Sequence, residues 1–245
     1  MSHRYFSETP ITTESARLTG AEAHHLLHVM RAAVGTELAV FDGQGAEFRA
    51  EVVRTGRGEV EIRVLQRIEV DRELPVRITL GVALPKGDRQ RWLIEKAVEL
   101  GVARVVPLIT QHGVAQPTDS ALTRLQRAVI EASKQCGRNR LAEICPAEPF
   151  EAFVTKAPHD AVRLLAQPGG DKAWSTIVRG PLRETKSILL AVGPEGGFAD
   201  DEVTAAATAG WSIVDLGPRI LRVETAALAL MSLVACLAGS DLDQP

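Results

Sequence analysis

The carboxyl-terminal stretch, residues 187–236, constrains the fold of this chain more than any other part of the sequence. An apolar run at residues 187–192 is followed by glycine and proline, as is typical of a buried strand in a parallel sheet. Acidic residues then open a helix and suit its positive end. Strand, glycine loop and helix follow one another twice, at residues 187–192, 193–198, 200–210, 211–216, 217–224 and 225–237. This alternation predicts part of an α/β domain.

Both loops are expected at the ligand-binding edge of the sheet, because ligands of such sheets sit beyond the carboxyl ends of the strands. The loops differ from phosphate-binding loops, since they contain prolines, which lack N–H donors, and the apolar pair Ile220 and Leu221. Neither GxxxxGK[ST] nor GxGxxG occurs, which argues against a nucleoside triphosphate site and against a NAD-type oxidoreductase. The loops therefore favour a neutral, partly apolar ligand such as an adenosine.

The first 73 residues read as a small β-rich module. One short helix is expected at residues 20–33, and strands are expected at residues 37–41, 46–54 and 60–69. Glycine pairs between the strands are hairpin signals, and the alternation of apolar and charged residues in the last strand predicts one buried face. A charged segment ending in Pro75 marks the boundary, so we place the domains at residues 1–73 and 74–245.

The second domain opens with a βαβ unit, which comprises residues 77–84, 89–100 and 102–109. A longer helix at residues 121–136 and a strand at residues 161–167 lead to the carboxyl-terminal stretch. Between residues 86 and 140, ten lysines and arginines occur against five aspartates and glutamates. This local excess is compatible with a phosphate-contacting face, and equally with a solvated helix surface.

Composition limits the classes to which the chain can belong. With 245 residues, 45% of them hydrophobic, the chain can bury a substantial core. Its net charge of −3 alone gives no reason to expect a nucleic-acid or membrane partner. The three cysteines form no CxxC pair and the histidines no metal-spaced cluster, so we expect reduced thiols and no metal. A signal peptide and long apolar runs are lacking, which predicts a cytoplasmic protein.

Taken together, the two loops and three further segments resemble the ribosomal RNA small subunit methyltransferase E family of the knotted SPOUT methyltransferases. The most specific segments are GPEGGF at residues 193–198 and LGPRILRVETA at residues 216–226. The others are His24-His25 through Arg31 with Asp42-Gly43, LPKGDR at residues 84–89 with EKAVELG at residues 95–101, and Glu131-Ala132 with Gln135, Arg138 and Asn139. The resemblance thus spans nearly the whole chain in the same order.

The resemblance implies an α/β fold with two domains. Residues 1–73 would form a PUA-like β-barrel that binds RNA, and residues 74–245 a SPOUT methyltransferase domain with a deep trefoil knot at about residues 187–239. The cofactor would be S-adenosylmethionine, and the enzyme a homodimer. The implied reaction is methylation of N3 of one uridine in 16S ribosomal RNA, with the assembled small ribosomal subunit as the expected partner.

The resemblance also implies which residues form the site. Those expected to bind the cofactor are Gly193, Glu195, Gly196, Gly197, Leu216, Gly217, Ile220, Leu221, Thr225 and Ala226. Those expected to contact RNA are Arg4, His25, Arg31, Lys86, Arg89, Arg140 and Arg219. For some of these residues a structural role is open as well, since Leu216 and Leu221 suit core packing and the loop arginines could instead pair with Glu195 or Glu224.

Methyl transfer demands mainly alignment of the uridine N3 with the methyl group. The N3–H proton must also leave, so either a base accepts it or positive charge stabilises the anion as it forms. We expect Arg222 and Arg138 to stabilise the anion and Glu224 to be a candidate base.

The sequence departs from the family after Thr110. Where relatives usually carry an Arg-Ser pair, this chain has Gln111 and His112, so a contact made by that arginine cannot be transferred. Two alternatives remain: a SPOUT methyltransferase for another nucleotide, such as a tRNA ribose or a large-subunit base, and an RNA-binding assembly factor with a degenerate cofactor site. Intact glycines in both loops argue against the second.

Overall fold

The computed structural model describes residues 4–113, 117–158, 160–170 and 185–239. The chain divides into two compact units. The first comprises residues 1–73 and 130–141, and the second comprises residues 74–129 and 142–245. Residues 130–141, which the sequence pattern placed in the second domain, therefore pack with the first unit. In the part of the chain that the structure describes, no helix combines the length and the apolar character needed to cross a membrane.

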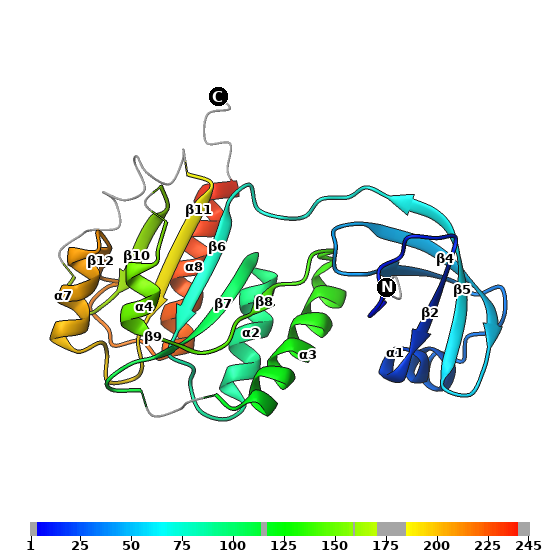
Figure 1. Ribbon diagram of the computed structural model, residues 1–245, viewed down its shortest axis with the longest axis horizontal. Coiled ribbons are helices and arrows are strands. Elements are labelled where there is room, and N and C mark those ends of the chain that lie inside the picture. Colours follow the sequence, from blue (N-terminus) through cyan, green and yellow to red (C-terminus); the bar gives the residue numbers. More distant parts are fainter. Residues whose placement is uncertain (1–3, 114–116, 159, 171–184, 240–245) are drawn as a thin grey trace. The chain divides into compact units, whose positions relative to one another are not determined.

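The first unit is built on a five-stranded sheet with the order β1-β3-β4-β5-β2 (Figure 1). Its strands are β1 (Arg4–Phe6), β2 (Ser15–Thr19), β3 (Glu37–Phe41), β4 (Glu47–Thr55) and β5 (Glu59–Ile68). β1 and β3 are parallel, whereas the pairs β3–β4, β4–β5 and β2–β5 are antiparallel. Alternate residues of β4 and β5 point into the core, where Phe48, Val52, Val60 and Ile62 are buried, as period-2 patterning predicts.

The helix predicted at residues 20–33 is shorter and changes its winding. It is an α-helix, α1 (Gly20–His24), that continues as a π-helix, His25–Val29. Wide turns close it: the Met30 N–H donates to the His25 carbonyl and the Ala32 N–H to the Leu26 carbonyl. Arg31 then has a φ of 52°, which no right-handed helix can continue through.

The second unit contains a seven-stranded sheet with the order β12-β10-β11-β6-β7-β8, and β9 pairs with β7. All these pairings are parallel. The strands are β6 (Arg77–Val82), β7 (Val102–Ile109), β8 (Glu143–Ile144), β9 (Glu148–Pro149), β10 (Val162–Ala166), β11 (Ser187–Val192) and β12 (Ser212–Val214). Because parallel strands need crossover helices, this sheet confirms the predicted α/β class.

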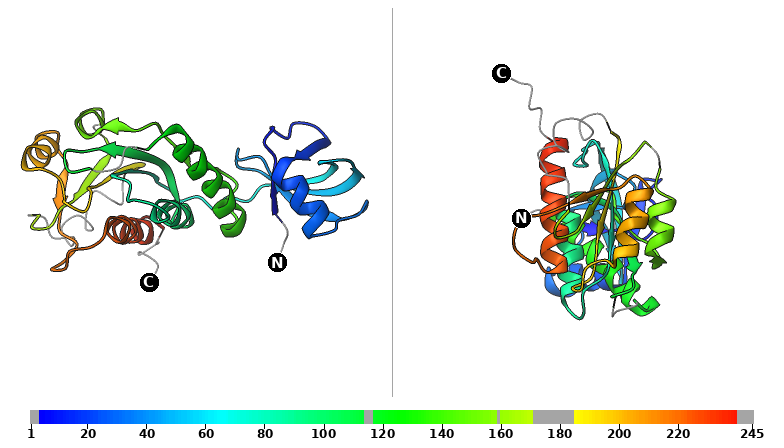
Figure 2. Two further views of the ribbon diagram at one scale, coloured as in Figure 1. Left: turned by 90° about the horizontal axis from the view of Figure 1, so that it is seen from below. Right: turned by 90° about the vertical axis from the view of Figure 1, so that its left-hand side faces the viewer.

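Helices cover both faces of the second sheet. They are α2 (Arg89–Glu99), α4 (Phe150–Thr155), α7 (Asp200–Thr208) and α8 (Val223–Gly239); the helix α3 (Asp119–Cys136) runs on into residues of the first unit. Figure 2 shows α2 and α8 on one face of the sheet and α4 and α7 on the other. The strand predicted at residues 211–216 ends earlier, at Val214, so Asp215 and Leu216 belong to the following loop. The predicted trefoil knot stays a prediction.

The centre of the second sheet is packed tightly enough to require a glycine. A Cβ atom at Gly81, near the carboxyl end of β6, would lie 2.6 Å from ring carbons of Phe153 in α4. Val106, Leu108, Leu165 and Ala191 form the rest of this core. The core holds β10, β11 and β6 side by side, which fixes where the loops that follow them leave the sheet.

Candidate functional site

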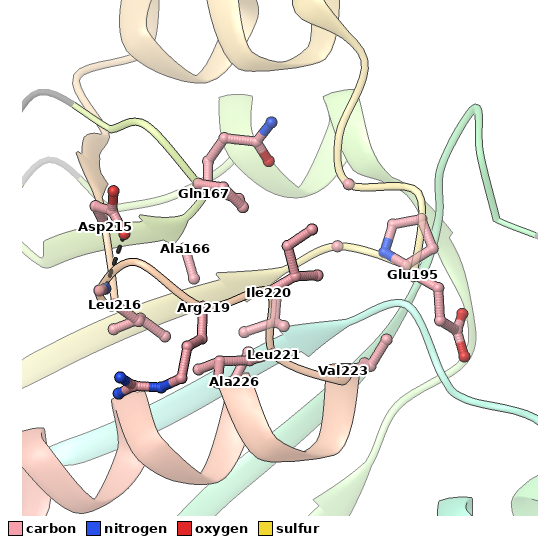
Figure 3. A pocket seen from close by; sticks show the side chains of 16 residues that line it. Ala166, Gln167, Glu195, Asp215, Leu216, Arg219, Ile220, Leu221, Val223 and Ala226 are labelled. Atoms are coloured by element: carbon pink, nitrogen blue, oxygen red, sulfur yellow. Dashed lines mark hydrogen bonds between the residues drawn. The ribbon is translucent and has the colours of Figure 1, made fainter.

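A pocket lies at the carboxyl ends of β10, β11 and β12 (Figure 3). The space within its outline is about 550 Å³, which includes open solvent, so the pocket is an open cleft at the edge of the sheet. Figure 3 shows Gln167 on one side of the pocket and Leu221 and Ala226 on the other, beside α8. The lining residues are Ala166, Gln167, Pro168, Val192, Gly193, Pro194, Glu195, Gly197, Asp215, Leu216, Gly217, Arg219, Ile220, Leu221, Val223 and Ala226.

Asp215 joins two of the loops that form the pocket. Its Oδ1 accepts a hydrogen bond from the Gly217 N–H at 2.8 Å, and its Oδ2 accepts one from the Gly169 N–H at 3.1 Å. The first bond closes a local turn, as aspartate commonly does at the start of a loop. The second ties the loop after β10 to the loop after β12, because these two strands are neighbours in the sheet.

The glycine loop after β11, residues 193–198, is a tight turn. Its Gly197 N–H donates to the Pro194 carbonyl at 2.9 Å, and Gly197 has a φ of 72°, which favours glycine. The following Phe198 N–H donates to the Gln167 Oε1 at 3.3 Å. Gln167, from the loop after β10, thereby fixes one side of the glycine loop.

Most of the residues predicted to bind a cofactor line the pocket. These are Gly193, Glu195, Gly197, Leu216, Gly217, Ile220, Leu221 and Ala226. The other two do not: Thr225 is exposed on α8, and a Cβ atom at Gly196 would lie 3.2 Å from the Cβ of His112. Gly196 therefore packs closely against His112 and does not line the pocket.

Arg89 contacts two carboxylates beside the pocket. Its Nη2 donates to the Glu195 Oε1 at 3.3 Å, and its Nη1 lies 3.6 Å from the Glu224 Oε1. Glu224 is 7% exposed, and its Oε2 has no hydrogen-bond partner among the described residues. From the sequence, Arg89 is expected to contact RNA and a loop arginine is a candidate partner for these glutamates. In the structure, Arg89 in the first turn of α2 is the arginine that contacts Glu195 and Glu224.

The loop arginines are placed differently from each other. Arg219 lines the pocket and is exposed. Arg222 directly precedes α8, where its carbonyl accepts the Ala226 N–H at 2.8 Å, and its side chain is exposed. Within the described residues, the Arg222 guanidinium makes no hydrogen bond or ion pair. Its charge is therefore available to a ligand, beside the lining residues Leu221 and Val223.

Arg138, predicted as catalytic, is buried in the first unit. Its side chain is 5% exposed, and its guanidinium forms a two-point ion pair with Glu73, in which Nε donates to Oε1 at 3.0 Å and Nη2 donates to Oε2. Such a bidentate pair is a strong structural contact. This environment favours a structural role over the predicted catalytic one.

Arg4, predicted to contact RNA, is also occupied within the first unit. It pairs with Glu47, donates to the Asn139 Oδ1 at 2.8 Å and lies over the Phe41 ring at 4.9 Å. Burial, together with the nearby charge of Arg72, lowers the pKa of the Arg4 guanidinium. Arg4 Nη2 also donates to the Arg138 carbonyl at 3.2 Å, so β1 is attached to residues 138–139, which pack with the first unit.

The remaining predicted RNA contacts are exposed. His25 lies in the π-helical turn and Arg31 follows it, Arg140 lies against the backbone of Gly45, and Lys86 lies between β6 and α2. Their exposure is compatible with RNA contacts, which stay predictions. Among the described residues, no three His, Cys, Asp or Glu side chains are grouped so that they could hold a metal ion.

Sequence reasoning missed the loop after β10. Ala166, Gln167 and Pro168 line the pocket because β10 lies between β11 and β12 in the sheet. A Pro-Gly-Gly turn after a strand was the only local signal, and its significance depends on strand order. Asp215 was missed because the strand was predicted to continue through it.

Comparison with known proteins gives matches over both units. A model of the RNA methyltransferase domain matches residues 72–235, and a model of the RNA methyltransferase PUA domain matches residues 18–65. The ribosomal RNA small subunit methyltransferase E of Synechocystis sp. is 33% identical over 234 residues, which cover 94% of this chain and 76% of that protein. The protein of the same name from Bacillus subtilis is 30% identical, with 95% of each chain covered.

Solved structures with bound cofactor match along nearly the whole chain. The crystal structure of a ribosomal RNA small subunit methyltransferase E from Neisseria gonorrhoeae, bound to S-adenosyl methionine, is 30% identical with a TM-score of 0.88 and covers 97% of this chain and 98% of that one. A putative methyltransferase from Legionella pneumophila, in complex with the same cofactor, has the same identity and TM-score and covers 96% of this chain and 98% of its own.

Proposed function

The chain belongs to the ribosomal RNA small subunit methyltransferase E family, and from this premise we propose that it transfers a methyl group from S-adenosylmethionine to N3 of a uridine in 16S ribosomal RNA. The observation that carries the proposal is the pocket between the loops after β10, β11 and β12. The match to residues 18–65 supports the predicted PUA-type module as the part that binds RNA. We place the protein in the cytoplasm, the compartment of its proposed substrate.

The lining of the pocket fits the adenosine part of this cofactor. Leu216, Leu221 and Val223 offer an apolar surface to a flat base, and backbone groups of the glycine loops offer polar contacts. Gly217 has a φ of 108°, and a Cβ atom there would meet nothing within 4 Å. The backbone at Gly217 is therefore open to close approach by a ligand, which a side chain would prevent.

The acidic side chains of the pocket fit the charge of the cofactor. S-adenosylmethionine supplies an electrophilic methyl group on a positively charged sulfonium. Glu195 and Asp215 line the pocket, and Glu224 lies beside it. Arg89 offsets part of this negative charge through its contacts with Glu195 and Glu224. Arg219 in the lining and the adjacent Arg222 add further positive charge, so the sulfonium would meet individual carboxylates rather than a strongly negative pocket.

The proposed chemistry requires the chain to accept the N3–H proton or to stabilise the anion that forms as this proton leaves. We assign anion stabilisation to Arg222, which directly follows the lining residue Leu221. Its exposed guanidinium forms no hydrogen bond or ion pair with the described residues. Glu224 is the proposed proton acceptor, since its buried Oε2 accepts no hydrogen bond from the described residues. Arg219, at the pocket, is proposed to contact the RNA.

The function is tested by methyl transfer from labelled S-adenosylmethionine to small ribosomal subunits that lack the modification. Free 16S RNA and large subunits serve as alternative substrates, and mass spectrometry identifies the labelled nucleoside. We expect label as 3-methyluridine in the small subunit alone. Label on another nucleotide would refute the proposed target, and absence of label with the cofactor bound would indicate an assembly factor.

We also propose that the protein is a homodimer through the face that carries α2 and α8. These helices pack together and expose Trp92, at 46%, and Leu233, at 37%. Large apolar side chains exposed on neighbouring helices are typical of a subunit interface. A second copy of the chain is the proposed partner.

Replacing Leu233 with glutamate should weaken this dimer at least tenfold, because a charge would be buried without a partner at the interface. Light scattering after size-exclusion chromatography, over a range of concentrations, measures the effect. Val53→Glu is the matched control, since Val53 is 38% exposed and belongs to β4 of the first unit. A wild-type protein that is monomeric at every concentration would refute the dimer.

A further inference from the structure

The turn that follows β7 lies against the glycine loop. In this turn, which comprises residues 111–113, the His112 Nδ1 lies 3.2 Å from the Gly197 carbonyl oxygen. His112 also packs closely on Gly196: a Cβ atom added at Gly196 would lie 3.2 Å from the Cβ of His112. His112 therefore contacts two consecutive residues of the glycine loop.

Two further bonds hold the turn in place. The Gln111 N–H donates to the Glu202 Oε1 at 3.0 Å, and the Gln111 Nε2 donates to the Asp201 Oδ2 at 2.6 Å. Glu202 is 8% exposed, and its other oxygen accepts the Ala199 N–H at 2.9 Å. The turn is thus anchored to the start of α7, which leaves His112 little freedom to move away from Gly197.

The contact specifies which ring nitrogen of His112 carries a hydrogen. A carbonyl oxygen only accepts hydrogen bonds, so the His112 Nδ1 must carry the hydrogen that it donates to Gly197. With that bond, side chains hold three consecutive residues: Gly197 of the loop by His112, Phe198 of the loop by Gln167, and Ala199 directly before α7 by Glu202. These side chains come from three different segments of the second unit.

Such restraint matters because the glycine loop is intrinsically free. Gly196 and Gly197 adjoin each other, and glycine loses more conformational freedom on ordering than any other residue. Gly197 and Gln167 both line the pocket, so the loop must be ordered whenever the pocket is formed. A loop that is already ordered before binding loses less entropy when a ligand arrives, which raises affinity.

We propose that His112 is a positioning residue that preorganises the glycine loop for the cofactor by holding the Gly197 carbonyl. The assignment of the ligand as S-adenosylmethionine rests on the proposed function, whereas the ordering of the loop does not. His112 acts through Gly197 and is not proposed to touch the reacting atoms.

The test compares His112→Ala, His112→Asn and, as a control in the first unit, His28→Ala. The amide nitrogen of asparagine can occupy the place of Nδ1 and donate the same bond. Calorimetry should show S-adenosylmethionine binding about three- to tenfold weaker in His112→Ala, as expected for loss of one hydrogen bond. Binding in His112→Asn should return to within about twofold of the wild type, and His28→Ala should bind as the wild type does.

Hydrogen exchange of residues 193–199 in the cofactor-free protein gives a second readout that does not depend on the ligand. We expect faster exchange in His112→Ala and wild-type rates in His112→Asn. The proposal would be overturned if His112→Ala exchanged at the wild-type rate, or if His112→Asn exchanged as fast as His112→Ala. Failure of the wild type to bind the cofactor would instead refute the proposed function, while the exchange rates still decide the role of His112.

Discussion

Replacing Arg138 with alanine is expected to lower the free energy of unfolding of the first unit by about 3–5 kcal/mol. The side chains of Arg138 and Glu73 are 5% and 19% exposed and form a two-point ion pair. Removing the guanidinium leaves the Glu73 carboxylate largely buried and without its partner, which costs more than the intact pair contributes. Arg138→Lys should recover only part of the loss, because an ammonium cannot make the bidentate contact.

Hydrogen exchange of β1–β5, measured by mass spectrometry, reports the stability of the first unit separately from that of the second. Arg127→Ala is the matched control, since Arg127 is exposed on α3 and its loss should change stability by no more than about 0.5 kcal/mol. A stable Arg138→Ala protein that has lost methyl transfer would restore the catalytic role predicted from the sequence.

The two predicted catalytic arginines show what a single sequence cannot reveal. Arg138 follows Gly137, and Arg222 lies in the loop that contains Gly217. Both segments are basic, so nothing in the local sequence distinguishes the two arginines. Glu73, the partner of Arg138, is 65 residues away, and Arg89 contacts a glutamate 106 residues away. Ion pairs of this kind depend on how distant segments pack, which the residue pattern does not encode.

Only part of the pocket was predictable from the sequence, because one of its three loops is placed there by strand order alone. The loops after β11 and β12 carry the glycines and prolines that distinguish them, and their strands are apolar and short. The loop after β10 contributes equally to the pocket, but only the strand order β12-β10-β11 places it there. Periodicity identifies strands, whereas strand order is a tertiary property, so Gln167 could not be assigned from the sequence.

Replacing Arg222 with alanine should reduce the turnover number by about 10²–10³ while leaving S-adenosylmethionine affinity within about twofold of the wild type. Its side chain is exposed and uncommitted among the described residues, so its removal should not destabilise the fold. If the guanidinium stabilises the anion that forms as N3 loses its proton, its loss affects the transition state more than the bound ground state.

Single-turnover methyl transfer and calorimetry on the same variants separate these two effects. Arg222→Lys should retain part of the activity, because it keeps the positive charge but not the planar guanidinium. The rate of Arg222→Ala should also rise more steeply with pH than that of the wild type, since a more basic solution favours loss of the N3–H proton. Arg219→Ala, by contrast, should raise KM for the RNA with little change in turnover. Near-normal turnover in Arg222→Ala, with cofactor binding unchanged, would exclude anion stabilisation by this residue and leave Glu224 as the remaining candidate for handling the proton.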